Sequence, residues 1–175
     1  MNRLGLILLI LAALPALPVL FAVEPARAQA QRTGPSGLAL PRFVSLKSDK
    51  VNVRVGPSRD HDIAWTFVKE GLPVEIIQEF DNWRRIRDHA GDDGWIFHKL
   101  LSGRRTALVD PERAEGTISL YREASSDSDL AAWLEPRVIV NVSSCDGTWC
   151  RVEIDSVTGW VDQASLYGVY PGEAF

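Results

Sequence analysis

The chain has 175 residues, of which 46% are hydrophobic, 24% charged and 9% aromatic. These fractions are typical of a globular protein and exclude a disordered, collagenous or polytopic membrane chain. The formal net charge of −4 at pH 7 argues against a nonspecific nucleic-acid binder, because such a protein needs a basic face. Two cysteines and one methionine exclude a cysteine-rich metal scaffold and a disulfide-dense mini-protein.

The N-terminal segment has the pattern of a secretory signal peptide. A short positive stretch at residues 1–3 precedes an almost wholly apolar run at 4–23, and two small residues, Ala26 and Ala28, then supply a signal peptidase site. We expect cleavage after Ala28, which leaves Gln29 as the first residue of an exported protein. An uncleaved N-terminal anchor is the alternative, because about 20 apolar residues can span a bilayer. After cleavage no long apolar run remains, so no membrane association is expected.

The rest of the chain has the pattern of short β-strands separated by turns. Residues 51–55, 74–80, 83–87 and 95–97 are rich in β-branched and aromatic residues, and Gly, Pro, Asn and Asp cluster between them. Short runs at such close spacing predict a small β-barrel. Residues 29–42, which precede the first run, are expected to be a flexible linker.

The strand pattern occurs twice along the chain. Six tryptophans form two sets of three that recur at about 65 residues, and Trp83 and Trp95 of the first set correspond to Trp149 and Trp160 of the second. Two copies of this length fit neither a solenoid nor a propeller. The repeat therefore predicts an all-β protein with two small domains in tandem. We expect the two domains at residues 43–103 and 104–170. The signal peptide is expected at 1–28, and a tail at 171–175.

Two cysteines flank a turn signal in the second copy. Cys145 and Cys150 lie on either side of Asp146 and Gly147, and alternating β-branched residues on both sides complete a strong hairpin signal. Disulfides persist in exported proteins, and cysteines on the two arms of one hairpin can reach bonding distance. We therefore expect a structural disulfide between Cys145 and Cys150. A redox-active pair is the alternative, which the absence of CxxC spacing disfavours.

Four motifs follow one another in the first copy. They are Val-Asn-Val-Arg-Val-Gly-Pro-Ser at 51–58, Gly-x-Pro-Val at 71–74, Trp-x-x-Ile at 83–86 and Gly-Trp-Ile at 94–96. In this order they resemble the bacterial SH3-like (SH3b) domains. The second copy matches in its latter half, whereas its counterpart of the first motif, at 120–125, lacks the Arg-x-Gly-Pro core. The resemblance implies two small five-stranded barrels and binding to cell-wall peptidoglycan or to peptides outside the cytoplasmic membrane.

The region around Gly94 also resembles eukaryotic SH3 domains, but the resemblance does not extend to proline-motif recognition. Where those domains carry a Pro and a Tyr in the ligand groove, the first copy has Phe97 and Leu100, and the second has Asp162 and Ser165. A PxxP ligand needs an aromatic-lined groove. Polyproline binding is therefore not expected.

We expect no catalytic residue, no metal and no cofactor. The three histidines, His61, His89 and His98, lie among polar loop residues without metal-ligand spacing. SH3b domains often accompany cell-wall peptidases that use a Cys nucleophile, but both cysteines of this chain are assigned to the hairpin. The chain is therefore expected not to be an enzyme.

The candidate ligand site is the edge of the first copy around Trp83. A Trp ring can stack on a sugar or a peptide face, and an Arg can form a forked pair with a carboxylate. We therefore assign ligand binding to Trp83 with Arg54, Arg85 and the loop residues Asp60 and Asp62. This copy keeps the Arg-x-Gly-Pro core and is closer to neutral than the strongly acidic second copy. The alternative is an exposed strand face whose solvated arginines pair with Glu79 or Asp88. A further alternative places Trp83 in the core.

These observations lead to three functional hypotheses. The first is a non-catalytic binding module, periplasmic or secreted, that recognises peptidoglycan or a peptide through its first barrel. The second is a structural adaptor that binds another envelope protein through a packed tandem-barrel surface. The third, an enzyme, has no motif in its support. None of the three involves nucleic acid, and the sequence leaves the oligomeric state open.

Overall fold

The computed structural model describes residues 32–110, 112 and 115–175. The segment predicted to be the signal peptide lies outside the described residues. Within the described part of the chain, no helix has the length and apolar character that a membrane crossing requires.

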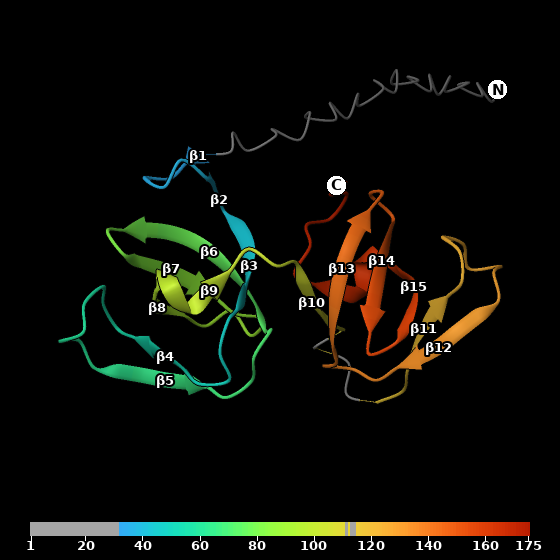
Figure 1. The fold of residues 1–175 in the computed structure, drawn as a ribbon, viewed down its shortest axis with the longest axis horizontal. Helices are drawn as coiled ribbons and strands as arrows, with labels where there is room; N and C mark the ends of the chain where they lie inside the picture. Colours follow the sequence, from blue (N-terminus) through green and yellow to red (C-terminus); the bar gives the residue numbers. More distant parts are fainter. Residues whose placement is uncertain (1–31, 111, 113–114) are drawn as a thin grey trace, which may run out of the picture. The chain divides into compact units, whose positions relative to one another are not determined.

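Two seven-stranded sheets contain most of the described strands (Figure 1). We call the first sheet, with the 3₁₀ helix η1 (His98–Leu100), the first barrel. Its strands lie in the spatial order β5 (Ile63–Phe67), β4 (Val51–Arg54), β8 (Asp93–Phe97), β7 (Trp83–Arg87), β6 (Pro73–Phe80), β3 (Arg42–Leu46) and β9 (Leu101–Ser102). All neighbouring strands pair antiparallel.

The second sheet, with η2 (Gln163–Ser165), forms the second barrel and repeats this order strand for strand. Its strands lie in the order β12 (Leu130–Leu134), β11 (Ile118–Tyr121), β15 (Val157–Asp162), β14 (Trp149–Ile154), β13 (Ile139–Cys145), β10 (Thr106–Val109) and β16 (Leu166–Tyr167). The predicted all-β fold with tandem copies is therefore confirmed.

Alternation of apolar and polar residues builds both cores. On β4, Val51 and Val53 are buried, whereas Asn52 and Arg54 point outward. Successive side chains of a strand face opposite sides, so a period of two places one set of residues in the core. The core of the first barrel consists of Val44, Leu46, Val51, Val53, Val74, Ile76, Ile86 and Ile96.

Strand register shows the repeat residue by residue. Trp83 lies opposite Phe97 in the first barrel, and Trp149 lies opposite Asp162 in the second. The glycine of the Gly-Trp motif is needed for close strand packing, since a Cβ on Gly94 would lie 2.5 Å from Cγ1 of Val53. The sequence repeat therefore corresponds to a repeat in strand pairing.

The hairpin of β13 and β14 carries the predicted disulfide. Cys145 and Cys150 are directly opposite each other and are bonded, with their Cα atoms 4.1 Å apart. Asp146 stabilises the turn between them, because its Oδ1 accepts hydrogen bonds from the backbone N–H groups of Thr148 at 2.8 Å and Trp149 at 2.7 Å. The disulfide prediction is confirmed.

The flexible linker expected at 29–42 is wrong over its described part, 32–42. There β1 (Arg32–Thr33) pairs with β2 (Ala39–Leu40), and β3 begins at Arg42. The Gly-Pro-Ser-Gly stretch has the composition of a linker, but it forms a turn that packs against Glu79 of β6. A Cβ on Gly34 would lie 2.6 Å from Oε2 of that carboxylate.

The described residues cluster as a single compact unit. Thr106 of β10 donates from its hydroxyl to the carbonyl oxygen of Gly71 at 2.7 Å, and Tyr170 donates from its hydroxyl to Oε1 of Glu75 at 3.0 Å. The ring of Tyr170 also packs against Phe43 with 4.8 Å between centroids. These contacts join residues of the two barrels.

The segment expected as a tail, 171–175, is held against the disulfide hairpin. Phe175 and Cys145 exchange backbone hydrogen bonds of 3.0 and 3.1 Å. Arg105 binds Glu173 through two hydrogen bonds of 2.9 Å. The C-terminal residues therefore belong to the folded unit.

Candidate ligand-binding groove

The first barrel carries a surface groove of about 350 Å³. Three of its lining residues are cationic, three are apolar or aromatic, and one is an amide. They are Lys50, Asn52, Arg54, Arg59, Trp83, Phe97 and Leu100. We call this the aromatic–cationic groove.

Trp83 and Phe97 form the aromatic wall of the groove. They lie opposite each other on β7 and β8, and their rings meet edge to face with 5.7 Å between centroids. Ile86, three residues after Trp83 on β7, is fully buried and faces the core. Because side chains alternate along a strand, Trp83 faces away from the core. Trp83 is half-buried and lines the groove, and it is therefore not a core residue.

The cationic side of the groove comes from β4 and the β4–β5 loop. Arg54 points outward from β4, and its Nη1 donates to the carbonyl oxygen of His61 at 2.5 Å. Arg59, in the loop, places its guanidinium 5.8 Å from the centroid of the Phe97 ring. Lys50 precedes β4 and is exposed. The loop thus brings an arginine from outside any strand to the aromatic wall.

The groove cations differ from the arginines of β3 and β7, which are all ion-paired. Those pairs are Arg42–Glu79, Arg84–Glu79, Arg85–Asp93 and Arg87–Glu75, with distances of 2.7, 3.2, 2.7 and 2.6 Å. Within the described ranges, Lys50, Arg54 and Arg59 form no ion pair with a carboxylate. The groove therefore presents positive charge that the described protein does not neutralise by direct contact.

The structure brings together two of the five residues assigned to the site from sequence. Trp83 and Arg54 line the groove. Arg85 instead binds Asp93 through its Nε at 2.7 Å, outside the groove lining. Asp60 and Asp62 are exposed in the β4–β5 loop and do not line it. A role for any of the five in binding remains a prediction.

Sequence reasoning missed the other five lining residues. Phe97 and Leu100 differ from the Pro and Tyr of eukaryotic SH3 grooves, but they occupy the corresponding positions and line the groove with Trp83. That correspondence was the available signal for these two. For Asn52 the signal was alternation, which places it on the same face of β4 as Arg54. Lys50 and Arg59 carried no comparable signal, since loop conformation decides what they face.

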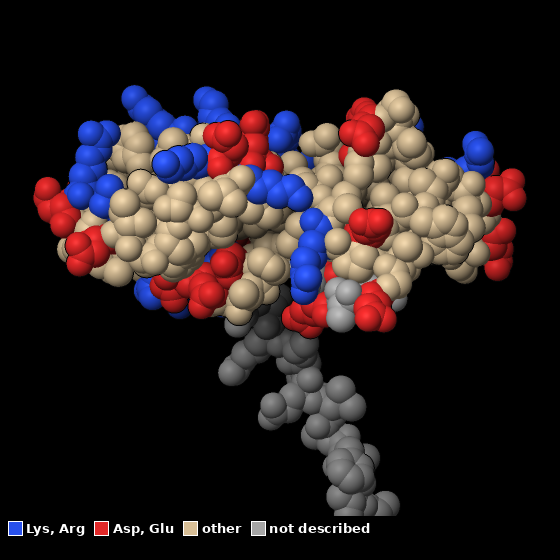
Figure 2. All heavy atoms as spheres, turned by 90° about the horizontal axis from the view of Figure 1, so that it is seen from below, with Lys and Arg blue, Asp and Glu red and all other residues tan. Residues whose placement is uncertain are grey.

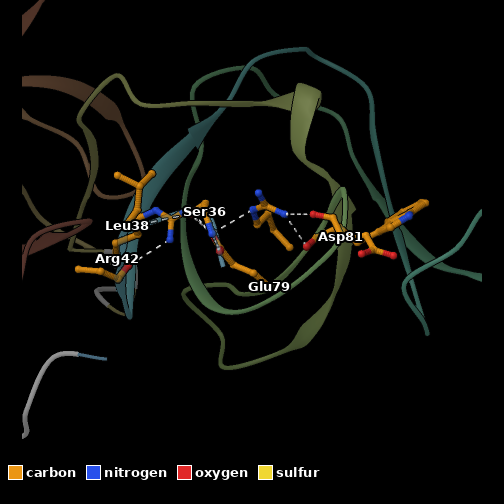
Figure 3. A network of polar contacts seen from close by, with 8 residues as sticks. Ser36, Leu38, Arg42, Glu79 and Asp81 are labelled. Carbon is orange, nitrogen blue, oxygen red and sulfur yellow. Dashed lines mark hydrogen bonds and ion pairs between the residues drawn. The ribbon is translucent and has the colours of Figure 1, made fainter. Parts of the chain in front are cut away.

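The buried carboxylate of Glu79 lies in a polar network next to the turn at Asp81 (Figure 3). The side chain of Glu79 is 1% exposed, and its Oε1 accepts from Nη2 of Arg42 at 2.7 Å and lies 3.2 Å from Nε of Arg84. Ser36 adds hydrogen bonds from its backbone N–H at 2.8 Å and its hydroxyl at 2.7 Å. Burial by itself raises the pKa of Glu79, but the bonds from Ser36 and Arg42 and the charge of Arg84 outweigh it and lower the pKa to about 2.

Arg84 connects the carboxylate of Glu79 to the backbone of the β6–β7 turn. Its Nη1 donates to the carbonyl oxygens of Asp81 at 2.8 Å and Trp83 at 2.9 Å. Asp81 has a positive φ of 46° in the tight turn between β6 and β7, a conformation that Asp tolerates better than most residues. The ion pair with Glu79 therefore holds the turn that positions Trp83.

The second barrel has a different surface at the matching place. Trp149 packs against Tyr121, with 5.6 Å between ring centroids, and the residue opposite Trp149 is Asp162. The carboxylate of Asp162 accepts from the backbone N–H of Ala164 at 2.9 Å. The face shown in Figure 2 carries more Lys and Arg side chains over the first barrel than over the second. The second barrel therefore places an aspartate where the aromatic–cationic groove of the first barrel has Phe97.

The sequence matches the family model of the bacterial SH3 domain at residues 47–103 and again at 114–168. These two matches cover more than half of the chain, and the protein therefore belongs to the bacterial SH3 domain family, with two copies in tandem. Members of this family are cell-wall binding modules. No curated protein matches the sequence.

Some solved structures are similar to this chain at low identity. NlpC2 from Trichomonas vaginalis is 15% identical, with 73% of this chain and 48% of that chain covered and a TM-score of 0.31. NlpC1 from the same organism is 16% identical, with coverages of 86% and 50% and a TM-score of 0.31. An NlpC/P60 family protein from Bacillus cereus is 12% identical, with coverages of 71% and 55% and a TM-score of 0.31. The chain spans about half the length of these structures.

Proposed function

We propose that this protein is a non-catalytic binding module of the cell envelope that holds peptidoglycan through the aromatic–cationic groove of its first barrel. The observation that carries the proposal is the groove itself, in which the ring pair of Trp83 and Phe97 adjoins cations without carboxylate partners. Membership of a family of cell-wall binding modules supports the same assignment.

The groove offers two kinds of contact that suit this polymer. Peptidoglycan presents sugar rings and peptide stems, and an aromatic face such as that of Trp83 can stack on either. The guanidinium groups of Arg54 and Arg59 can donate forked hydrogen bonds to polar groups of the ligand. Binding by these contacts needs no reacting group, which fits the proposed role of a module that holds the polymer.

Export to the periplasm or the medium is part of the proposal. The disulfide between Cys145 and Cys150 supports it, because such bonds persist in oxidising compartments. The wall polymer that the groove would bind lies in the same compartment. The signal sequence predicted at 1–28 would direct the chain there.

Cosedimentation of the purified exported protein with protein-free peptidoglycan sacculi tests the proposal. The variants are Trp83→Ala and its counterpart in the second barrel, Trp149→Ala, each checked by circular dichroism and thermal unfolding. Loss of an aromatic anchor at the centre of a site costs at least about 2 kcal/mol, or about 30-fold in affinity. We expect this loss for Trp83→Ala alone. Equal loss in both variants, or loss only in Trp149→Ala, would overturn the assignment to the first barrel.

A structural adaptor is the second candidate function, and one observation favours it. On the edge strand β12, Trp133 is 59% exposed and Leu130 is 40% exposed, and exposed apolar side chains gathered in one place are typical of protein-binding surfaces. An adaptor would not bind protein-free sacculi, whereas the wall-binding module would. Wild-type protein that remains wholly in the supernatant would therefore favour the adaptor.

A further inference from the structure

We infer that the aromatic–cationic groove recognises a carboxylate on the peptide stems of the wall polymer. This inference rests on the proposed function and deepens it, since it names the chemical group that the groove selects. It starts from the charge of the lining: Lys50, Arg54 and Arg59 are the charged residues among the lining side chains, and all three are cationic.

The acidic side chains near the groove do not neutralise these cations by contact. Asp60 and Asp62 belong to the same loop as Arg59, but both are exposed and neither lines the groove. The carboxylate of Asp60 is instead engaged locally, because its Oδ2 accepts a hydrogen bond from the Ser58 hydroxyl at 3.3 Å. A cationic or neutral ligand would leave three positive charges without compensation, whereas an anionic ligand would complement them.

The two arginines are arranged to hold a planar anion beside an apolar group. Arg54 is half-buried and anchored by its bond to the carbonyl oxygen of His61, and Arg59 is near the Phe97 ring. A guanidinium matches a carboxylate with two parallel hydrogen bonds, and holding it in place in advance reduces the entropy lost on binding. Trp83 and Leu100 then provide apolar surface for the part of the ligand next to the carboxylate.

The attraction between the groove cations and a ligand carboxylate acts only within the groove, because the chain as a whole has a negative net charge. The formal charge is −4 at pH 7, so the protein as a whole repels an anionic polymer. Screening limits the reach of exposed charges to about 8 Å at physiological ionic strength. The groove cations therefore act on a carboxylate that enters the groove, and the rest of the surface adds no general attraction.

The test compares untreated sacculi with sacculi whose carboxylates are blocked by carbodiimide coupling to ethanolamine; mock-treated sacculi are the control. The protein variants are Arg54→Gln, Arg59→Gln and, as a matched control outside the groove, Arg151→Gln, which changes an exposed arginine on β14 of the second barrel. We expect wild-type affinity to fall at least about 10-fold on blocked sacculi. Each groove variant should bind untreated sacculi about 5-fold more weakly than wild type, the upper end for one exposed ion pair, and should match wild type on blocked sacculi, where the carboxylate contact is gone. Arg151→Gln should behave as wild type on both.

The possible failures are distinguishable from each other. If the wild type binds both preparations equally and Trp83→Ala abolishes binding, the proposed function stands and the carboxylate inference is overturned. If blocking weakens binding but Arg54→Gln and Arg59→Gln match the wild type, the carboxylate contact lies outside the groove. If neither preparation binds, both proposals fail. Arg59→Gln alters an exposed loop residue, so it tests the inference even if Arg54→Gln disturbs the fold.

Discussion

Replacing Glu79 with Gln should destabilise the protein by about 3 kcal/mol at neutral pH. The carboxylate has a side chain 1% exposed and a pKa lowered to about 2, against about 4.3 for an unperturbed glutamate. By linkage, a gap of this size amounts to about 3 kcal/mol of stabilisation of the folded state. Gln keeps the shape of the side chain but removes the charge, which leaves Arg42 and Arg84 without their carboxylate partner.

The same change should remove part of the sensitivity to acid. Because the folded-state pKa of Glu79 is lowered, its stabilisation is fully present above about pH 5, well above the unfolded-state pKa, and is lost as the pH falls toward 2. Gln does not titrate. The difference in unfolding free energy between wild type and Glu79→Gln should therefore be constant above about pH 5 and shrink between about pH 5 and 2.

Urea unfolding between pH 2 and 7, followed by tryptophan fluorescence, measures this difference. Glu70→Gln is the matched control, because Glu70 is exposed and forms no ion pair among the described residues. It should leave the unfolding free energy within about 0.5 kcal/mol of wild type. A Glu79→Gln effect below about 1 kcal/mol at pH 7, or one that persists undiminished at pH 2, would refute the reasoning.

Three further predictions concern processing, the disulfide and the groove. Intact-mass analysis of the exported protein should give Gln29 as its first residue; retention of the preceding segment would contradict the predicted cleavage. Labelling of the denatured, unreduced protein should find no free thiol, and two labelled thiols would argue against the bond. Reduction of Cys145–Cys150 should lower the unfolding free energy by only about 2 kcal/mol, because the closed loop is short. Phe97→Asp gives the first barrel the residue type that the second barrel has at the matching position, Asp162. It should keep the fold and lower sacculus affinity at least about 10-fold. Unchanged binding in cosedimentation would exclude Phe97 from the site.

The sequence by itself determined the fold class, the tandem organisation and the disulfide hairpin. Each depends on neighbouring residues: the alternation in Val51–Arg54, the recurrence of Gly-Trp at Trp95 and Trp160, and the turn between Cys145 and Cys150. Period-two alternation and turn residues act within a few positions of the chain, so they can be read without knowing what packs where. The position of Trp83 at the start of a hairpin strand was predictable for the same reason.

Only the tertiary structure decided which side chains meet. Arg59 reaches Phe97 because the β4–β5 loop places it near β8, and Arg85 binds Asp93 because β7 pairs with β8 in one particular register. The segment around Ser36 forms a hairpin, and Ser36 donates two hydrogen bonds from its turn to the carboxylate of Glu79. These contacts join residues that are distant in sequence or lie on loops, and local alternation carries no information about them. The charge of the groove therefore emerged from packing.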